Sequence, residues 1–330
     1  MDSKPLVTIG VVSCNRLHYL KALMESAREC IQYEPIQWIV VDNASVEPGL
    51  RDYVEGLEFV QHKLCMPERR PSTEHVDAMN RIVAMAEADY LMLLPEDVQF
   101  IMRGPWLADF VELLESHPRI GSITFDAQRR VTLERFFGRP GWAGELFRRA
   151  RRRTYRSRSG TTFLGYGRSK PGIAGAGICT FARTAIWKRL GPWTSVRRQT
   201  VADSTGGGED EMLARYRRSG LRLERSLAQI PVCAGILTDP IGSKGRVRGN
   251  RRYGRYVAPP EGRLYYRVWD QDEVEALGHG KVAVGFEDLV VPLSFELPYD
   301  EQGNVLKNPH QRADDPFEWI HASVAGQDIS

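Results

Sequence analysis

The first 125 residues alternate short apolar runs with longer segments whose apolar residues recur at helical spacing. A short apolar run bounded by turn residues predicts a buried strand, and apolar residues three or four apart predict a helix that packs through one face. Strands and helices that alternate along a chain are typical of a parallel sheet covered by helices. We therefore expect an α/β fold in which a mostly parallel sheet lies between helical layers.

The apolar pattern also gives approximate bounds for each element. The expected strands of the first region are residues 6–13, 37–41, 57–61, 90–94 and 120–125, and its expected helices are residues 17–31, 74–86 and 106–115. Later in the chain, strands are expected at 176–182 and 221–227, and helices at 184–190 and 209–219.

Charge divides the remainder of the chain. Residues 128–158 hold eleven arginines against two acids, and the regular alternation stops across 126–172, so we expect a long basic loop or insertion there. Residues 242–256 add six cations and no acids. From residue 261 onward, fourteen acids oppose five cations. We expect residues 257–330 to form an acidic C-terminal appendage wrapped on the main domain.

The composition is that of an ordinary globular protein, because 42% of the 330 residues are hydrophobic and 26% are charged. The five cysteines are scattered and never form a Cys-x-x-Cys pair, which favours small buried residues over a disulfide framework or a zinc site. No apolar stretch reaches the roughly 18 to 20 residues that cross a bilayer. We expect a soluble, cytoplasmic protein.

A carboxylate follows the second expected strand. Asp42 would stand at the carboxyl edge of the parallel sheet, where the ligands of open α/β folds bind, and could accept hydrogen bonds from a base or a ribose. Aspartate also ends strands as a turn former, and that alternative stays open.

Two further acids, Glu96 and Asp97, follow the fourth expected strand directly after Pro95. Acids in this position suit a hard divalent cation, Mg²⁺ or Mn²⁺, that a carboxylate shares with the two phosphates of a nucleoside diphosphate. The alternative is a pair of acids that caps the N-terminus of a helix.

A third acidic position opens the expected helix at 209–219. Gly207 and Gly208 precede Glu209 and Asp210, and glycines let a substrate approach the backbone. Asp210 is then suited to act as a general base that takes the proton of an acceptor hydroxyl. Acids in a first helical turn also complement the helix dipole, which is the structural alternative.

Taken in order, four segments of the chain resemble the family 2 glycosyltransferases of GT-A fold. They are residues 7–16 (Val-Thr-Ile-Gly-Val-Val-Ser-Cys-Asn-Arg), 38–45 (Trp-Ile-Val-Val-Asp-Asn-Ala-Ser), 80–98 (ending Leu-Leu-Pro-Glu-Asp-Val) and the Gly-Glu-Asp at 208–210. The likeness covers about residues 5 to 232. It implies a Rossmann-like sheet and the inverting transfer of one sugar from a nucleoside-diphosphate sugar, with a UDP-sugar favoured, to a hydroxyl acceptor in polysaccharide, glycolipid or glycoconjugate biosynthesis.

The resemblance also implies a role for individual residues. The implied roles are the nucleotide pocket for Ser13, Cys14 and Asn15, the base contact for Asp42, the ribose or sugar contact for Glu96, the metal site for Asp97 and the catalytic base for Asp210. Residues 1–125 would then be the nucleotide-sugar-binding half of the domain, and residues 173–256 the half that binds the acceptor and carries the base.

The sequence departs from the family pattern in ways that bear on the metal and the product. Glu96 replaces the commoner aspartate, and Thr238 and Asp239 stand in a stretch where a histidine ligand is often seen. Binding of Mn²⁺ or Mg²⁺ would thus rest on Asp97, phosphates and water. The Gln-x-x-Arg-Trp element of processive synthases is absent, so we expect one sugar per encounter.

The basic segments suggest anionic partners. Lys244 or Arg246 could meet the pyrophosphate, or could belong to a solvated turn. In the basic insertion, arginines interleave with aromatic residues such as Trp142, so this insertion could close over the donor, receive the acceptor or contact an anionic membrane surface. A solvated loop without a partner is the alternative.

Two other classes of function compete with this interpretation. A sugar nucleotidyltransferase would also use acids and a metal, but it needs a glycine-rich, basic loop after its first strand, which Ser13-Cys14-Asn15-Arg16 is not. A non-catalytic nucleic-acid-binding protein would use the many cations, but it gives no reason for acids at three successive sheet-edge positions. Both rank below the glycosyltransferase hypothesis, and nucleic acid is not an expected partner.

Overall fold

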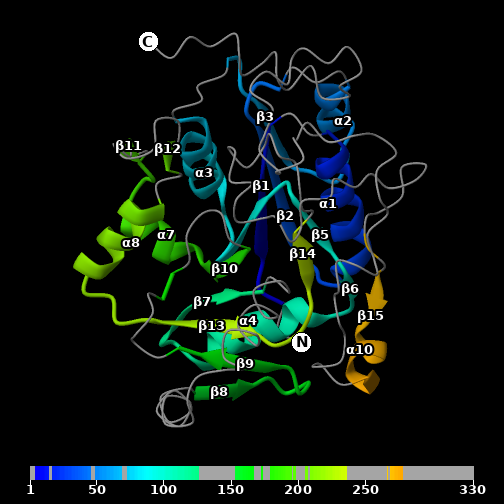
Figure 1. Cartoon of the computed structure of the whole chain (residues 1–330), viewed down its shortest axis with the longest axis vertical. Coiled ribbons are helices and arrows are strands. Elements are labelled where there is room, and N and C mark those ends of the chain that lie inside the picture. Colours follow the sequence, from blue (N-terminus) through cyan, green and yellow to red (C-terminus); the bar gives the residue numbers. More distant parts are fainter. Residues whose placement is uncertain are drawn as a thin grey trace, which may run out of the picture.

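The computed structural model describes residues 4–14, 17–45, 49–68, 73–125, 153–166, 172–173, 179–194, 196–197, 205–206, 209–235, 266 and 268–277. Within these ranges a nine-stranded sheet forms the centre of the molecule, in the order β3-β2-β1-β4-β10-β7-β13-β9-β8 (Figure 1). Its strands are β1 (Val7–Ser13), β2 (Ile36–Asp42), β3 (His62–Cys65), β4 (Tyr90–Pro95), β7 (Ile120–Thr124), β8 (Arg153–Arg156), β9 (Thr162–Gly165), β10 (Thr180–Arg183) and β13 (Glu224–Ala228).

Most strands of this sheet point the same way. β3, β2, β1 and β4 are parallel neighbours, and β13 runs parallel to β7. Only β10 and β9 oppose them among the strands described, because each pairs antiparallel with the strands on both of its sides. The expectation of an α/β fold with a mostly parallel sheet is confirmed.

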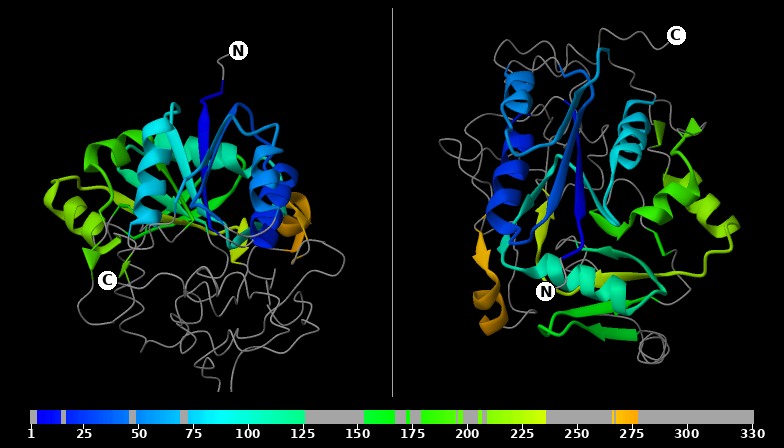
Figure 2. Two further views of the ribbon diagram at one scale, coloured as in Figure 1. Left: turned by 90° about the horizontal axis from the view of Figure 1, so that it is seen from above. Right: turned by 180° about the vertical axis from the view of Figure 1, so that it is seen from behind.

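Side chains alternate between the two faces of the sheet and bury both. In β1, Val7, Ile9 and Val11 join the core on one face, while Val12 joins the core on the other. The first face is covered by α1 (Leu17–Cys30), α2 (Leu50–Glu55), α4 (Trp106–Ser116) and α10 (Gln271–Leu277). The second face is covered by α3 (Glu74–Met85), α7 (Thr184–Leu190) and α8 (Glu209–Arg218), so that the sheet lies between two helical layers (Figure 2).

Gly10 lets α3 approach the sheet closely. A Cβ atom at this position would lie 2.2 Å from Cγ2 of Ile82, which is fully buried in α3. Non-bonded carbon atoms do not approach this closely, so any larger residue at position 10 would push α3 away from β1. The absence of a side chain at Gly10 therefore sets the distance between α3 and the strands that carry the candidate site.

Aromatic rings fill the core beneath α4. The Trp106 ring stacks on Phe100 with centroids 5.7 Å apart and packs against Phe110 at 5.3 Å. Phe110 in turn meets Phe163 of β9 edge-on, with centroids 5.7 Å apart. Such contacts stabilise beyond the area that they bury, and here they join α4 to the far end of the sheet.

Four short strands extend the first face beyond the main sheet. β5 (Val98–Phe100) pairs with β14 (Cys233–Gly235), and β6 (Met102–Arg103) pairs with β15 (Trp269–Asp270). The buried Gln99 amide both donates to the Tyr266 carbonyl oxygen at 2.9 Å and accepts from the Tyr266 amide at 3.0 Å. The described part of the acidic C-terminal segment therefore packs on the main domain.

The structure corrects several expectations. Residues 57–61 are not a strand: α2 ends at Glu55, and β3 lies at His62–Cys65. Within the segment expected to be irregular, β8 and β9 form an antiparallel hairpin at the edge of the sheet. Asp109 of α4 fastens the tip of this hairpin, because its carboxylate accepts from Ser159 at 2.6 Å and from Thr161 at 2.7 Å.

Not every cysteine is buried. Cys30, Cys179 and Cys233 are buried as expected, whereas Cys14 and Cys65 are only half-buried. Both half-buried cysteines lie at the carboxyl edge of the sheet, where the candidate site is.

Candidate active site

Three neighbouring parallel strands end together and bring the predicted residues to one edge of the sheet. In the strand register, Ser13 at the end of β1 faces Asp42 at the end of β2. On the other side of β1, Val12 faces Pro95 at the end of β4, and Glu96 and Asp97 follow at once. The structure thus groups four of the predicted side chains at the carboxyl edge, where ligands of open α/β sheets bind.

The Asp42 carboxylate closes a tight turn after β2. It accepts a hydrogen bond from the Ser45 amide at 2.9 Å and another from the Ser45 hydroxyl. Ala44, inside the turn, has a positive φ of 50°. This is the turn-forming arrangement that the sequence left open.

Polar atoms without partners lie beside this turn. Within the described part of the chain, the buried Ser13 Oγ and Asn43 Oδ1 have no hydrogen-bond partner. A buried polar atom that lacks a partner costs free energy, so such atoms mark places where a ligand or water is expected to bind. Sequence reasoning missed Asn43, although it directly follows Asp42 and carries an amide suited to a base or a ribose.

Two thiols complete this part of the edge. The half-buried Cys14 points its sulfur at the Asn43 carbonyl oxygen, 3.8 Å away. Cys65, at the end of β3, faces Asp42 in the strand register, and its pKa is raised first by burial and then by the charge of Asp42. The neutral thiol is therefore the favoured form at neutral pH. Asn15 lies outside the described residues.

Glu96 and Asp97 form the turn that joins β4 to β5, rather than capping a helix. Glu96 is buried, whereas Asp97 is half-buried and, within the described structure, has no hydrogen bond or ion pair. Directly after this turn, Val98 pairs with Gly235 of β14. Asp97 thus presents its carboxylate at the carboxyl edge of β4.

One carboxylate is compatible with a divalent cation that takes its other ligands from phosphates and water, as Mg²⁺ often does. No group of three or more His, Cys, Asp and Glu side chains that could hold a metal ion is found among the described residues. Asp97, the residue predicted to bind the metal, would therefore have to share the cation with ligands other than described His, Cys, Asp or Glu side chains.

Asp210 is the second residue of α8, which packs beside α7 on the second face of the sheet. The neighbouring Glu211 is not a candidate base, because an ion pair with Arg215 of the same helix holds its carboxylate and lowers its pKa. The predicted site residues that lie outside the described part are Gly207, Gly208, Trp142, Lys244 and Arg246, together with the side chains of Glu209 and Asp210.

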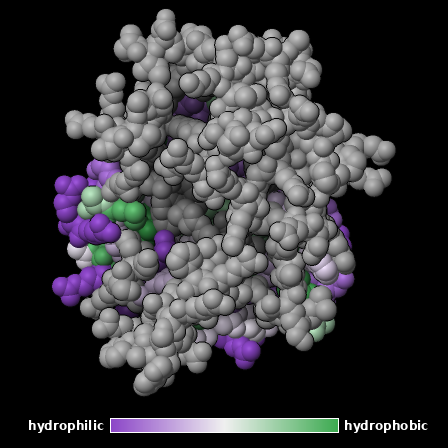
Figure 3. Space-filling view, in the orientation of Figure 1, coloured by the Kyte–Doolittle hydropathy of each residue, from purple (hydrophilic) through white to green (hydrophobic). Residues whose placement is uncertain are grey.

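Around α8 and α7 the surface shows hydrophilic and hydrophobic side chains next to each other (Figure 3), and the exposed Arg217 and Arg218 lie in the last turn of α8. Across the described residues, we find no helix that is both long enough and apolar enough to span a membrane.

Comparison with known proteins finds a family model that matches about half of the chain. Residues 8–170 match the family model described as Glycosyl transferase family 2. One curated relative, the uncharacterized protein y4gI of Sinorhizobium fredii, is 26% identical over 123 residues. That match spans 37% of this chain and 13% of the relative.

Solved structures with a similar arrangement are distant in sequence. Staphylococcus aureus TarS shares 13% identity over 71% of this chain and 61% of that one, with a TM-score of 0.45. The mannosyltransferase PcManGT from Pyrobaculum calidifontis, solved in complex with GDP-Man and Mn²⁺, shares 15% identity over 78% of this chain and 67% of that one, with a TM-score of 0.48.

Proposed function

We propose that this chain, whose residues 8–170 match the family 2 glycosyltransferase model, transfers one sugar from a nucleoside-diphosphate sugar to a hydroxyl acceptor with inversion at the anomeric carbon. A UDP-sugar is the favoured donor, and a polysaccharide, glycolipid or other glycoconjugate is the expected product.

One observation carries the proposal: Ser13, Asp42 and the Glu96-Asp97 pair meet at the carboxyl ends of three adjacent parallel strands inside the family-matched region. In this arrangement the nucleotide binds along the ends of β1 and β2. Ser13, Cys14, Asn15 and Asp42 contact the base and ribose, and Glu96 reaches the ribose or the sugar. The partnerless Ser13 hydroxyl supports this placement, since a bound ribose or base would supply the missing hydrogen bond.

Asp97 would hold Mn²⁺ or Mg²⁺ together with the two phosphates of the donor. When bound, the cation would neutralise the charge that develops on the leaving diphosphate. Its half-buried, partnerless carboxylate supports this role, because no other interaction has to be broken for it to bind a cation.

The second basic segment is connected to the same place. Gly235, which precedes residues 236–265, pairs with Val98, and Tyr266, which follows them, is held by the Gln99 side chain. Both ends of this segment are therefore attached to β5, immediately after Asp97. This supports a contact between the pyrophosphate and Lys244 or Arg246, which lie within the segment.

Asp210 would act as the base. It takes the proton from the acceptor hydroxyl as that oxygen forms its bond to the anomeric carbon, while the bond from this carbon to the diphosphate oxygen breaks and the nucleoside diphosphate leaves. The acceptor region would include Gly207, Gly208, Glu209 and Trp142.

The protein would act in the cytoplasm, with a peripheral contact to an anionic membrane surface. Support comes from the hairpin of β8 and β9, which exposes Arg153, Arg156 and Arg158 at the free edge of the sheet. Clustered arginines of this kind are attracted to anionic headgroups.

The test is thermal unfolding with UDP, GDP, dTDP and CDP, each with and without Mn²⁺, because a ligand that binds only the folded state raises the unfolding temperature. We expect a metal-dependent rise with one nucleotide, UDP first. If none of the four nucleotides shifts the transition, the proposed function is wrong.

A further inference from the structure

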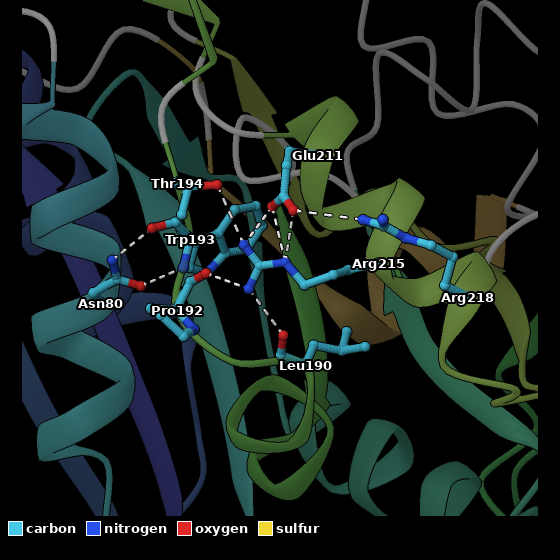
Figure 4. Close-up of polar contacts among 8 residues, drawn as sticks. All are labelled: Asn80, Leu190, Pro192, Trp193, Thr194, Glu211, Arg215 and Arg218. Atoms are coloured by element: carbon cyan, nitrogen blue, oxygen red, sulfur yellow. Dashed lines mark hydrogen bonds and ion pairs between the residues drawn. The ribbon is translucent and has the colours of Figure 1, made fainter.

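We propose that Arg215 is a positioning residue that fixes the first turn of α8, and with it the base Asp210, relative to the strands that bind the nucleotide. This inference rests on the proposed function and extends it to a residue outside the predicted site. Figure 4 shows the guanidinium of Arg215 at the centre of a polar cluster between α8, the end of α7 and the loop that follows α7.

Arg215 holds the first turn of its own helix. Its Nε donates to both carboxylate oxygens of Glu211, at 2.8 and 2.9 Å, and Nη2 donates to one of them as well. Glu211 directly follows Asp210, so this bidentate pair restrains the peptide next to the base. The two side chains are only 22% and 23% exposed, which limits the screening that weakens most surface pairs.

The same guanidinium holds the end of α7. Its Nη1 donates to the carbonyl oxygens of Leu190, the last residue of α7, and of Pro192, at 3.0 and 2.5 Å. Nη2 also donates to the Thr194 hydroxyl at 3.2 Å. The last carbonyl groups of a helix have no partner within it, and a cation there also complements the helix dipole. Arg215 therefore satisfies groups of α7 and restrains α8 at the same time.

The loop after α7, to which Arg215 donates hydrogen bonds, is also bonded to α3. The Asn80 side chain donates to the Trp193 carbonyl oxygen at 2.9 Å and accepts from the Trp193 amide at 2.6 Å. In Figure 4, Asn80 and Arg215 reach this loop from opposite sides. The loop cannot move with α8 without breaking the Asn80 contacts, so it is a fixed point for Arg215.

A continuous path connects this cluster to the nucleotide side of the site. β4, which delivers Glu96 and Asp97, pairs with β10, and α7 begins at the residue after β10. Arg215 then connects the end of α7 to the start of α8. The guanidinium is thus the polar connection between the metal-binding and base-carrying parts of the site, in addition to the apolar packing of Met212 and Tyr216, and a misplacement of about 1 Å can cost on the order of 100-fold in rate.

The experiment compares Arg215→Ala, Arg215→Lys and Glu211→Gln with the wild-type chain and with Arg218→Ala. Arg218→Ala is the matched control, because it removes the same charge from the same helix. The Arg218 side chain is 73% exposed, and its Nη2 lies 3.9 Å from the Glu211 carboxylate. Asp210→Asn is included to test the base itself. The readouts are UDP release into water from UDP-glucose and UDP-N-acetylglucosamine, and amide hydrogen exchange of residues 209–214.

We expect Arg215→Ala to lower kcat at least tenfold while the donor KM stays within about twofold, because the nucleotide contacts lie on other strands. Amide exchange of the first turn of α8 should quicken in this variant. Arg215→Lys should recover little, since three separate guanidinium nitrogens reach the acceptors of α8, α7 and the following loop, and one ammonium nitrogen cannot replace them. Arg218→Ala should behave like the wild type. Should Arg215→Ala not fold, the nearly isosteric Glu211→Gln gives the same test.

Different experimental results would contradict this inference and the proposed function. If Asp210→Asn is inactive but Arg215→Ala and Glu211→Gln keep the wild-type kcat and exchange rates, the positioning role is wrong and the proposed function stands. If Asp210→Asn keeps full activity, the proposed base is wrong and the inference falls with it, whereas the proposed donor site is judged separately by the thermal shifts with the four nucleotides.

Discussion

The backbone amide of Asn43 donates a hydrogen bond to the carbonyl oxygen of Ser13 at 2.8 Å. This bond continues the pairing of β1 and β2 by one residue beyond Asp42 and fixes the ends of both strands. The Ser13 hydroxyl and the Asn43 side-chain oxygen are therefore held in place although neither has a hydrogen-bond partner within the described structure. A ligand that pairs with them would find them already ordered.

Ser13→Ala should separate binding from stability. Removing a buried hydroxyl that has no partner should leave the free energy of unfolding unchanged or slightly raised, because an unsatisfied group of this kind costs about 1–3 kcal/mol. The affinity for UDP should fall by about 2- to 13-fold, which corresponds to one net hydrogen bond of about 0.5–1.5 kcal/mol. Urea unfolding and titration calorimetry with UDP give the two quantities.

Ser26→Ala is the matched control for that variant. The Ser26 hydroxyl is buried like that of Ser13, but it donates to the Ala22 carbonyl oxygen at 2.6 Å and accepts from the Phe100 amide at 3.0 Å. Removal of the Ser26 hydroxyl should destabilise the fold by about 1–3 kcal/mol and leave the affinity for UDP unchanged. Equal effects of the two variants on UDP affinity would contradict the placement of the nucleotide at Ser13.

Asp97→Asn should abolish the part of the nucleotide-induced thermal shift that depends on Mn²⁺. The unfolding temperature without ligand should change little, because the carboxylate is half-buried and has no partner within the described structure. Asp89→Asn serves as the control, since Asp89 precedes β4 at its opposite end and is exposed. A Mn²⁺-dependent shift that survives in Asp97→Asn would remove Asp97 from the metal site.

Gly10→Ala should destabilise the fold by at least about 1–3 kcal/mol, the usual cost of overpacking a core. The cause is the contact of 2.2 Å between the added methyl group and Ile82. Ile82→Ala alone should also destabilise, by about 2–5 kcal/mol, because it leaves a cavity. The double variant should be more stable than the sum of the two effects predicts, and a double-mutant cycle of urea unfolding measures the difference. Strict additivity would show that α3 shifts freely on the sheet.

Glu211 should make stability depend on pH in a defined direction. The ion pair with Arg215 lowers the pKa of Glu211 from its usual 4.5, so its contribution to stability is present above that value and is lost as pH falls through the lowered pKa. The advantage of the wild type over Glu211→Gln should therefore exist at pH 6 and shrink below about pH 4.5. Urea unfolding from pH 3 to 6 measures it, and an advantage that grows toward acid would contradict the ion pair.

Regular apolar patterns made much of this fold predictable. β1, β2, β4, α3 and α4 were expected within one or two residues of their bounds, because strands buried on both faces and amphipathic helices leave strong patterns in a sequence. Arrival of several acids at one sheet edge was predictable for the same reason, since parallel strands end together.

Other elements could not be read from the sequence, for physical reasons. β8 is an edge strand that carries arginines on a largely exposed surface, so it shows no apolar alternation. β3 is short and only half-buried, and the apolar residues Leu57 and Val60 are buried in the core of the first face from a turn rather than from a strand. Asn43 could not be identified from the sequence, because what marks it is a buried side-chain oxygen without a hydrogen-bond partner among the described residues, and only the three-dimensional structure shows this.

The attachment of residues 236–265 at both ends to a single three-residue strand has an evolutionary and practical consequence. Because Gly235 and Tyr266 are held by adjacent residues of β5, Val98 and Gln99, the segment between them can be lengthened, shortened or exchanged without moving its two points of attachment. Each doubling of a flexible loop adds only about 0.6 kcal/mol to the cost of closing it. Exchanging this stretch for loops of other transferases should therefore change the contacts proposed for Lys244 and Arg246 with the donor pyrophosphate, while the strands that carry Asp97 stay in place.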